Sequence, residues 1–355
     1  MAERETAAQL AEIASRGDQL GDILARAIPD ERAAPAWELV TRADRILLLA
    51  HEKPDPDTFG SALGLAFALA PLGKRCVVAC ADPVPANYTF LPGRETVMTD
   101  LPDEDFDLVI ALDAGELSRY GALYSRHQAF FDHATILNLD HHLSSSGIGA
   151  YAIIDVPSAA TAELLTILLL NRGVPIGREA AICLLAGIIT DTRSFEFEAT
   201  TDRTLMAGAY LVAQGATPQD IIKPMYRMKP LAKARLWGRA LQSLETTANG
   251  RAVWAVIRQE DLTAAGATPD MDDGLPAYLK DIEGVAMAAL FREQPDGRTR
   301  VSMRADAPYD AAALCGRFGG GGHARAAGCT LAMSMDAALR TFIPVMEETL
   351  DAHSE

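Results

Sequence analysis

Between Trp37 and Asp191 the chain alternates short apolar runs with stretches of helical periodicity, and this alternation limits the possible folds more than any other feature. Runs such as RILLLA, DLVIAL and ATILNL are typical of strands that are buried on both faces. Strands that alternate with helices predict a doubly wound parallel sheet, which is an α/β fold. In such a sheet, ligands bind in the crevice beyond the carboxyl ends of the strands.

Aspartate and histidine side chains stand where these runs end. Four segments carry them, and their ionisable members are His51, Asp55, Asp57, Asp113, Asp140, His141, His142 and Asp191. Each segment alone also has a common structural explanation, because aspartate often caps helices and Asp-Pro sequences often form turns. Together at one edge of a sheet, carboxylate and imidazole ligands without cysteine indicate a cluster of divalent cations. The adjacent triplet Asp140, His141 and His142 supports this interpretation, because three ionisable groups are costly to bury without a cation or a partner network.

The chemistry expected of such a cluster is metal-assisted hydrolysis. Two divalent cations roughly 3.5–4 Å apart share a bridging water, lower its pKa and polarise a phosphoryl oxygen. A carboxylate that binds both ions is needed to keep them so close. Oxygen-rich ligands with some histidine favour Mn²⁺, with Mg²⁺ as the second choice and zinc as the less suitable ion.

Residues 244–355 have a different pattern, which predicts a smaller α+β domain. RAVWAVIRQEDL, GVAMAALFREQ and RTRVSMRAD are expected to be strands, with a hairpin turn at Gln294–Gly297, and AALRTFIPVMEETL is expected to be the last helix. The basic stretch 224–243 is interpreted as a helical linker, so the first domain covers residues 36–223.

Residues 1–35 are expected to form a helical extension that packs on the body of the protein. ERAAPA is expected to end its periodic pattern. The apolar positions that fall near one face of this extension are Leu10, Ile13, Leu20, Ile23, Leu24 and Ile28.

A glycine segment, RFGGGGHARAAG, is the third informative motif. Consecutive glycines expose backbone N–H groups as phosphate-binding loops do, and ARAAG has the small residues expected at the start of a tightly packed helix. A flexible linker is the alternative, although linkers seldom lead directly into such a sequence. Arg304, near Ser302 on the preceding strand, is either a bidentate phosphate ligand or an exposed surface charge.

The bulk composition restricts the function further. A net charge of −16 argues against a broad basic surface that grips long duplexes, but it leaves small phosphorylated substrates open. No apolar run reaches the roughly 18–20 residues of a membrane helix, and the amino terminus lacks the apolar core of a secretory signal. The five cysteines contain no Cys-x-x-Cys pair and are expected to be buried free thiols. We therefore expect a cytoplasmic protein.

The order of the motifs is that of a known family. His-x-x-x-Asp-x-Asp, a lone Asp, Asp-His-His, Thr-Asp-Thr and Gly-Gly-Gly-Gly-His-x-x-Ala-Ala-Gly together resemble the DHH/DHHA1 phosphoesterases, over about residues 37–350. The resemblance implies a doubly wound DHH domain followed by a smaller α+β DHHA1 domain. Because the chain is compact, it is most similar to the branch that contains nanoRNases (oligoribonucleases) and pAp phosphatases.

The resemblance also implies roles for single residues. One Mn²⁺ would be held by His51, Asp55 and Asp113, and a second by Asp57, Asp113, His141 and Asp191, with Asp113 as the bridge. The expected catalytic residues are Asp113, His142, which would orient phosphate or the metal shell, and Asp140, which would fix a histidine. The expected substrate-binding residues, which would hold a terminal phosphate or a nucleotide, are Ser302, Arg304, Gly319, Gly320, Gly321, Gly322 and His323.

One loop departs from the family pattern. Arg193 follows Asp191-Thr192, where a glycine or another small residue is expected, and Glu196 and Glu198 make the loop more acidic than expected. The resemblance therefore leaves substrate preference at this edge of the site open.

The expected activity is Mn²⁺-dependent hydrolysis of short oligoribonucleotides to 5′-mononucleotides by a metal-activated water, with removal of the 3′-phosphate of pAp as a second reaction. One alternative is a phosphodiesterase that acts on pApA or cyclic dinucleotides. A family II pyrophosphatase would share the first domain but lack the glycine-histidine segment. A non-catalytic nucleotide-binding regulator is the alternative of another class, and the complete set of ligands argues against it. The expected partners are short RNA or small phosphorylated nucleotides, without a membrane or long duplex; a homodimer is one oligomer that the sequence leaves open.

Overall fold

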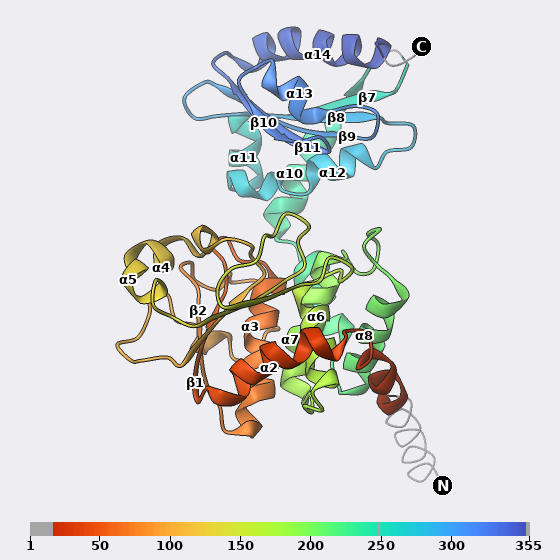
Figure 1. The fold of residues 1–355 in the computed structure, drawn as a ribbon. Coiled ribbons are helices and arrows are strands. Elements are labelled where there is room, and N and C mark those ends of the chain that lie inside the picture. The colour runs from red at the N-terminus through yellow and green to blue at the C-terminus, as the bar shows by residue number, and fades with distance from the viewer. Residues whose placement is uncertain (1–16, 248, 353–355) are drawn as a thin grey trace. The chain divides into compact units, whose positions relative to one another are not determined.

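The computed structural model describes residues 17–247 and 249–352. The chain divides into two compact units, Met1–Met228 and Lys229–Glu355. Each unit is built around a sheet of its own, the first drawn in red to green and the second in cyan to blue in Figure 1. None of the described helices is both long enough and apolar enough to span a membrane.

The first unit contains a parallel sheet with the strand order β2-β1-β3-β4-β5. Its strands are β1 (Arg45–Leu49), β2 (Arg75–Ala79), β3 (Leu108–Leu112), β4 (Ile136–Asp140) and β5 (Tyr151–Ile154). The chain runs from β1 outward to β2 and then returns past β1 to β3, so the direction of winding reverses between β1 and β3. This reversal is where doubly wound sheets bind ligands. The α/β fold predicted from the sequence is thereby confirmed.

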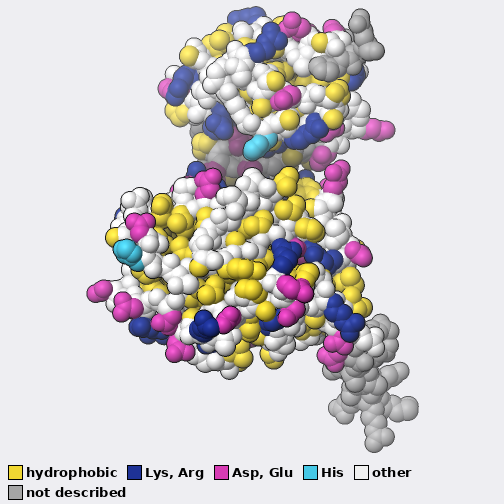
Figure 2. Space-filling model, viewed as in Figure 1, with side chains coloured by type: hydrophobic (Ala, Val, Ile, Leu, Met, Phe, Trp, Pro, Cys, Tyr) yellow, Lys and Arg dark blue, Asp and Glu magenta, His cyan; other side chains and the backbone are white. Residues whose placement is uncertain are grey.

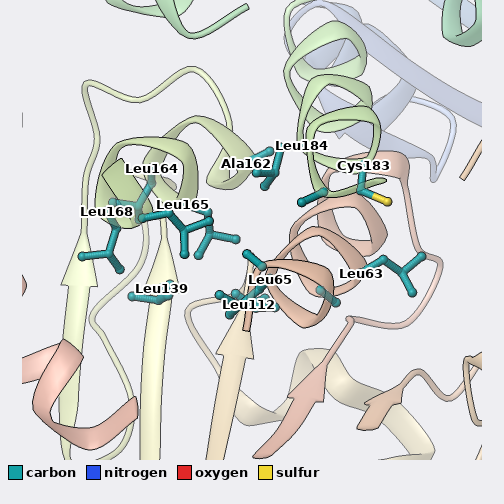
Figure 3. Packing of buried hydrophobic residues seen from close by; sticks show 14 of the residues in the cluster. Leu63, Leu65, Leu112, Leu139, Ala162, Leu164, Leu165, Leu168, Cys183 and Leu184 are labelled. Atoms are coloured by element: carbon teal, nitrogen blue, oxygen red, sulfur yellow. The ribbon is translucent and has the colours of Figure 1, made fainter. Parts of the chain in front are cut away.

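Helices cover both faces of this sheet. Besides the helical residues 17–24, the α-helices described in the first unit are α2 (Asp30–Arg42), α3 (Pro56–Leu69), α4 (Gly121–Arg126), α5 (Gln128–Phe131), α6 (Thr161–Asn171), α7 (Arg178–Asp191), α8 (Asp202–Ala213) and α9 (Pro218–Ile222). On one face, Leu112 and Leu139 point from β3 and β4 toward α3, α6 and α7 (Figure 3). On the other face, Leu47 and Val109 belong to a smaller core that includes residues of α4 and α5.

The second unit contains a mixed sheet with the order β10-β11-β9-β8-β7-β6. Its elements are α10 (Leu231–Gln242), β6 (Glu245–Thr246), β7 (Ala252–Ile257), α11 (Gln259–Ala265), α12 (Leu275–Lys280), β8 (Met287–Glu293), β9 (Thr299–Ala305), α13 (Ala311–Gly316), β10 (Gly321–His323), β11 (Ala326–Leu331) and α14 (Met335–Asp351). Residues of α13 and α14 pack on one face of the sheet, and residues of α10, α11 and α12 pack on the other. This is the smaller α+β domain that the sequence predicts.

Three local predictions were wrong. ERAAPA does not end a helix but lies within α2, where the burial of Ala33 and Ala36 outweighs the hydrogen bond that Pro35 cannot donate. ARAAG does not begin a helix: Ala324 and Arg325 form the turn after β10, and the remaining three residues begin β11. The strand expected over RAVWAVIRQEDL ends at Ile257, and the following residues begin α11.

The amino-terminal extension was predicted only in part. Residues 17–24 are helical, and Leu24 and Ile28 are buried in the core of the first unit. Ile23 points outward instead, with 56% of its surface exposed, although the periodicity placed it near the buried face. Leu10 and Ile13 lie outside the described residues.

Candidate metal centre

Six of the predicted metal ligands come together beyond the carboxyl ends of β1, β3 and β4. They are His51, Asp55, Asp57, Asp113, His141 and Asp191. Three groups have ligand atoms within 4.8 Å of one another: His51 with Asp55 and Asp113, Asp57 with His141 and Asp191, and Asp113 with His141 and His142. Asp113 belongs to two of these groups, which is the placement required of a carboxylate that bridges two cations.

The separations between ligand atoms suit a metal centre. Nε2 of His51 lies 3.4 Å from Oδ2 of Asp113 and 3.9 Å from Oδ2 of Asp55. Nε2 of His141 lies 3.6 Å from Oδ1 of Asp113 and 3.3 Å from Oδ2 of Asp191. Adjacent ligands on a cation with bonds of about 2.1 Å are roughly 3 Å apart, so small side-chain movements would complete the coordination.

Both imidazoles present Nε2 to the carboxylates. Nδ1 of His51 lies 2.8 Å from the carbonyl oxygen of Glu52, and Nδ1 of His141 lies 3.1 Å from that of Ser158. A carbonyl oxygen can only accept, so in the neutral imidazole Nδ1 carries the proton and Nε2 keeps its lone pair. Nε2 of His141 is buried, and it faces the carboxylates of Asp191 and Asp113. This donor set fits divalent cations.

The charges of the site also favour a cation. Burial and the charges of Asp113 and Asp191 raise the pKa of Asp57 well above its usual range. Burial raises the pKa of Asp191 to about 6, although its hydrogen bond with His141 opposes this shift. Burial lowers the pKa of His141, but the hydrogen bond to Asp191 and the charge of Asp113 outweigh it and raise the pKa to about 9. A divalent cation would replace the protons that these groups hold near neutral pH.

The position of the Asp113 carboxylate depends on its backbone. Its φ of 58° is in the left-handed region, which aspartate and asparagine enter more readily than most residues. The N–H of Asp113 donates to the carbonyl oxygen of Leu139 at 3.0 Å, and Oδ1 accepts from Oγ1 of Thr161 at 2.8 Å. These two hydrogen bonds fix the direction in which the carboxylate points.

Asp57 is held by the start of α6. Its carboxylate is fully buried and accepts from the N–H groups of Thr161 at 2.7 Å and Ala162 at 3.0 Å. The amino end of a helix carries partial positive charge, which stabilises the carboxylate. On α7, a Cβ at Gly187 would lie 2.4 Å from Oδ1 of Asp57, so glycine allows α7 to bring Asp191 next to Asp57.

Asp140 and His142 lie beside the ligands, as the predicted catalytic roles require. Oδ1 of Asp140 accepts from Nδ1 of His142 at 2.8 Å and from the N–H of His141 at 2.8 Å. Burial raises the pKa of Asp140, but its hydrogen bonds with His142 and Ser145 and the charge of His142 together outweigh burial and leave the pKa lowered. His142 is half-exposed and faces a cavity of about 370 Å³, which is lined by Asp113, Ala114, Gly115, Glu116, Arg119, His142 and Ser144.

The predicted substrate-binding residues lie together in the second unit. Strand pairing aligns Ser302 with Gly328 and Gly321, and aligns Arg304 with Ala326 and His323. Since side chains two residues apart share a face, these positions form one surface across β9, β11 and β10. Close packing requires glycine at two places here: a Cβ on Gly328 would lie 2.9 Å from the carbonyl oxygen of Val301, and a Cβ on Gly320, just before β10, would lie 2.3 Å from the carbonyl oxygen of Gly328.

The sequence reasoning missed the segment that holds three of the ligands. Within residues 155–161, the carbonyl of Ser158 accepts from His141, and Thr161 donates to both Asp57 and Asp113. A buried ion network supports this segment: Arg203 Nε donates to Glu163 at 2.7 Å, and Arg203 Nη2 donates to Asp155 at 2.9 Å and to Ser158 at 2.8 Å. The available signal was Glu163, a single charge inside the apolar helix TAELLTILLL.

Both units match known family models. Residues 45–188 match the amino-terminal domain of the DHH family, and residues 249–350 match the DHHA1 domain. Among solved structures, an exopolyphosphatase-related protein from Bacteroides fragilis shares the fold with a TM-score of 0.79. The two are 23% identical, and the match covers 91% of this chain and 97% of the other.

Curated relatives match over most of the chain. The bifunctional oligoribonuclease and PAP phosphatase NrnA of Thermus thermophilus is 32% identical over 86% of this chain and 90% of its own length. NrnA of Bacillus subtilis is 28% identical over 81% of this chain and 90% of its own length. The cyclic-di-AMP phosphodiesterase PdeA of Listeria monocytogenes is 25% identical over 81% of this chain but only 44% of its own length. The chain therefore belongs to the DHH family of phosphoesterases, with a DHHA1 domain after the DHH domain.

Proposed function

We propose that this protein is a Mn²⁺-dependent phosphoesterase that hydrolyses short oligoribonucleotides to 5′-mononucleotides and removes the 3′-phosphate of pAp. The observation that carries the proposal is the position of Asp113, whose two carboxylate oxygens lie 3.4 Å from His51 and 3.6 Å from His141. The similarity to the two NrnA proteins over most of their length supports this choice of substrates.

Two cation positions follow from the grouping of the ligands. We assign His51, Asp55 and Asp113 to one, and Asp57, His141 and Asp191 to the other. Asp113 is assigned to the second as well, because its Oδ1 lies 3.6 Å from Nε2 of His141. When bound, such a pair lowers the pKa of a shared water and stabilises negative charge on a phosphoryl oxygen. The carboxylate of Asp113 would contribute to both positions, and its hydrogen bond from Thr161 fixes its direction.

The remaining residues act on the substrate. His142, which Asp140 holds at 2.8 Å, faces the cavity and is placed to donate a hydrogen bond to a phosphate oxygen. Arg119 and Ser144 line the same cavity and offer further donors. In the second unit, the surface of Ser302, Arg304 and His323 would hold the terminal phosphate or nucleotide that is not cleaved.

The surface charge agrees with small substrates. On the face of the molecule in Figure 2, basic side chains of the first unit lie among acidic ones rather than in one continuous patch. Short fragments need only a few local donors, whereas long duplexes need many phosphate contacts. We place this reaction in the cytoplasm, where RNA fragments arise.

A phosphodiesterase that acts on pApA or cyclic dinucleotides is the second candidate, because PdeA of Listeria monocytogenes matches 81% of this chain. Time courses with Mn²⁺ on RNA of two to ten nucleotides, pAp, pApA, a cyclic dinucleotide and pyrophosphate separate the alternatives. The proposal expects 5′-mononucleotides from the shortest RNAs and AMP from pAp. Hydrolysis of cyclic dinucleotides alone would favour the second candidate, and hydrolysis of pyrophosphate alone would contradict both.

A further inference from the structure

The turn that follows α7 has a strained backbone. Arg193, Ser194 and Phe195 have φ angles of 48°, 64° and 69°. Residues other than glycine rarely adopt this left-handed backbone conformation, and three such residues in succession are unusual. Strained backbone of this kind persists where the surroundings hold it, and it occurs often at functional sites.

Packing and hydrogen bonds explain why the turn keeps this shape. The N–H of Ser194 donates to the carbonyl oxygen of Ile189 at 2.7 Å, and the N–H of Phe195 donates to Oγ1 of Thr192 at 2.9 Å. The ring of Phe195 packs against α8, where a Cβ on Gly208 would lie 3.0 Å from the ring. Phe195 therefore anchors the turn by its side chain.

Packing does not explain why the first residue of the turn is an arginine. Its side chain is 46% exposed, and its Nε forms an ion pair of 3.4 Å with Oε2 of Glu196, whose side chain is 65% exposed. Exposed ion pairs contribute little to stability. Glycine would adopt this φ without strain, so the stability of the fold gives no reason for an arginine at this position.

Arg193 lies next to the metal centre. It is two residues beyond Asp191, and its N–H donates to the carbonyl oxygen of Thr190 at 3.1 Å. The N–H of Thr192 donates to the carbonyl oxygen of Ile188 at 3.1 Å, so the turn folds back against the end of α7 that carries Asp191. Arg193 thus places a positive charge at the edge of a cluster whose carboxylates would otherwise repel a polyanionic substrate.

We propose that Arg193 binds a phosphate of the substrate other than the phosphate under attack. This inference rests on the proposed function, because pAp and 5′-phosphorylated RNA carry such a second phosphate. On binding, the guanidinium would exchange the carboxylate of Glu196 for two phosphate oxygens, a geometry that its planar donors match. Glu196 holds the guanidinium in place before the substrate arrives and competes with the phosphate afterwards.

The test compares Arg193→Gly, Arg193→Lys and Glu196→Gln with the parent chain. KM and kcat are measured with Mn²⁺ on pAp, on 5′-phosphorylated RNA dimers and trimers, and on bis-p-nitrophenyl phosphate, which has no second phosphate. The matched control is Arg126→Ala, because Arg126 is also a half-exposed arginine (51%) in an ion pair, with Asp100. Thermal unfolding of each variant is measured alongside.

Arg193→Gly should raise KM for pAp, the RNAs or both by about tenfold to a hundredfold, as expected for the loss of a hydrogen bond to a charged group. A raised KM for pAp would show that Arg193 binds the 5′-phosphate. A raised KM for the RNA trimer alone would show that it binds the next phosphodiester, and either result supports the inference. KM for bis-p-nitrophenyl phosphate and all constants of Arg126→Ala should match the parent. Arg193→Lys should retain part of the affinity, and Glu196→Gln should lower KM.

The melting temperature separates binding from structure. Arg193→Gly should unfold at the same temperature as the parent or at a higher one, because glycine relieves the strain at φ 48°. Three results for Arg193→Gly would overturn the inference: an unchanged KM, equal losses on all substrates, or a clearly lower melting temperature. The proposed function would still stand in these cases if the parent chain were active on pAp or RNA. A parent chain that hydrolyses neither pAp nor RNA would overturn the proposed function and this inference with it.

Discussion

The carboxylate of Asp113 lies between His51 and His141 because a left-handed backbone and two hydrogen bonds hold it there. Asparagine has nearly the same size as aspartate and also tolerates a φ of 58°. Asp113→Asn therefore removes only the charge that two cations would share. We expect kcat to fall at least about a hundredfold, as for the loss of a major electrostatic element. Steady-state kinetics, with circular dichroism to verify folding, measures this. Near-normal turnover in folded Asp113→Asn would contradict a bridging role.

The titration of the ligands predicts how stability depends on pH. In the protein without cations, the pKa of His141 is about 9 and that of Asp191 about 6, both above the values expected in the unfolded chain. The folded state therefore binds more protons, and the stability from protonated His141, present below pH about 6.5, is lost as pH rises through 9. The raised pKa of Asp191 affects stability in the same direction. The stability that its protonated form contributes is lost as pH rises from the pKa of the unfolded chain to about 6.

Cations reverse this dependence because they bind the deprotonated ligands. We expect Mn²⁺ to raise the melting temperature more at pH about 8 than at pH about 6. Thermal unfolding with and without Mn²⁺ across this range measures the difference. A metal-induced shift that is constant, or larger at the lower pH, would show that these groups are not the ligands.

At the scale of elements, the start of α6 positions the ligands without binding a cation itself. Thr161→Val removes the hydroxyl that donates to Asp113 but keeps the N–H that donates to Asp57. Since partners of metal ligands typically contribute tenfold to a hundredfold in affinity, we expect Mn²⁺ to bind about that much more weakly. Thr166→Val is the matched control, because Thr166 is also buried in α6 but donates to the carbonyl of Ala162.

Calorimetric titration with Mn²⁺ compares these two variants directly. The account predicts weaker binding for Thr161→Val and the parent's affinity for Thr166→Val. Equal affinities for both would show that the hydrogen bond to Asp113 has no role in the metal centre.

The surface across β9, β11 and β10 should act on the substrate rather than on the metal. Arg304→Ala and His323→Ala should weaken the use of nucleotides that end in a phosphate by roughly 1.5–3 kcal/mol each, as for a hydrogen bond to a charged group. Hydrolysis of bis-p-nitrophenyl phosphate and Mn²⁺ affinity should change much less. Equal losses on both substrates would assign these residues to catalysis or folding instead.

Most elements could be predicted from local pattern, and the exceptions have tertiary causes. The apolar runs before His51, Asp113 and Asp140 specified β1, β3 and β4, because strands buried on both faces are continuously apolar. ARAAG was misread because its small residues serve close approach between strands, as at Gly328, where a Cβ would lie 2.9 Å from the carbonyl oxygen of Val301. A periodic pattern does not reveal such a contact. The role of Thr161 depends on a contact 48 residues away in the chain and has no local signal.

At the scale of the whole molecule, the two units divide the work that the proposed reaction requires. The first unit brings the acidic and imidazole ligands to one edge of its sheet, and the second presents arginine and histidine on a surface of small residues. With a net charge of −16, attraction of polyanions depends on bound cations and a few local arginines rather than on the overall field. Short substrates suit this arrangement better than long ones.

The most direct test is a product analysis on the full chain after complete removal of metal. The metal-free protein should not cleave 5′-phosphorylated RNA of two to five nucleotides, and added Mn²⁺ should restore the release of 5′-mononucleotides. With added Mn²⁺, Asp113→Asn should stay at least about a hundredfold slower than the parent. Cleavage that survives chelation, or an absence of cleavage of every RNA and of pAp with saturating Mn²⁺, would contradict the account.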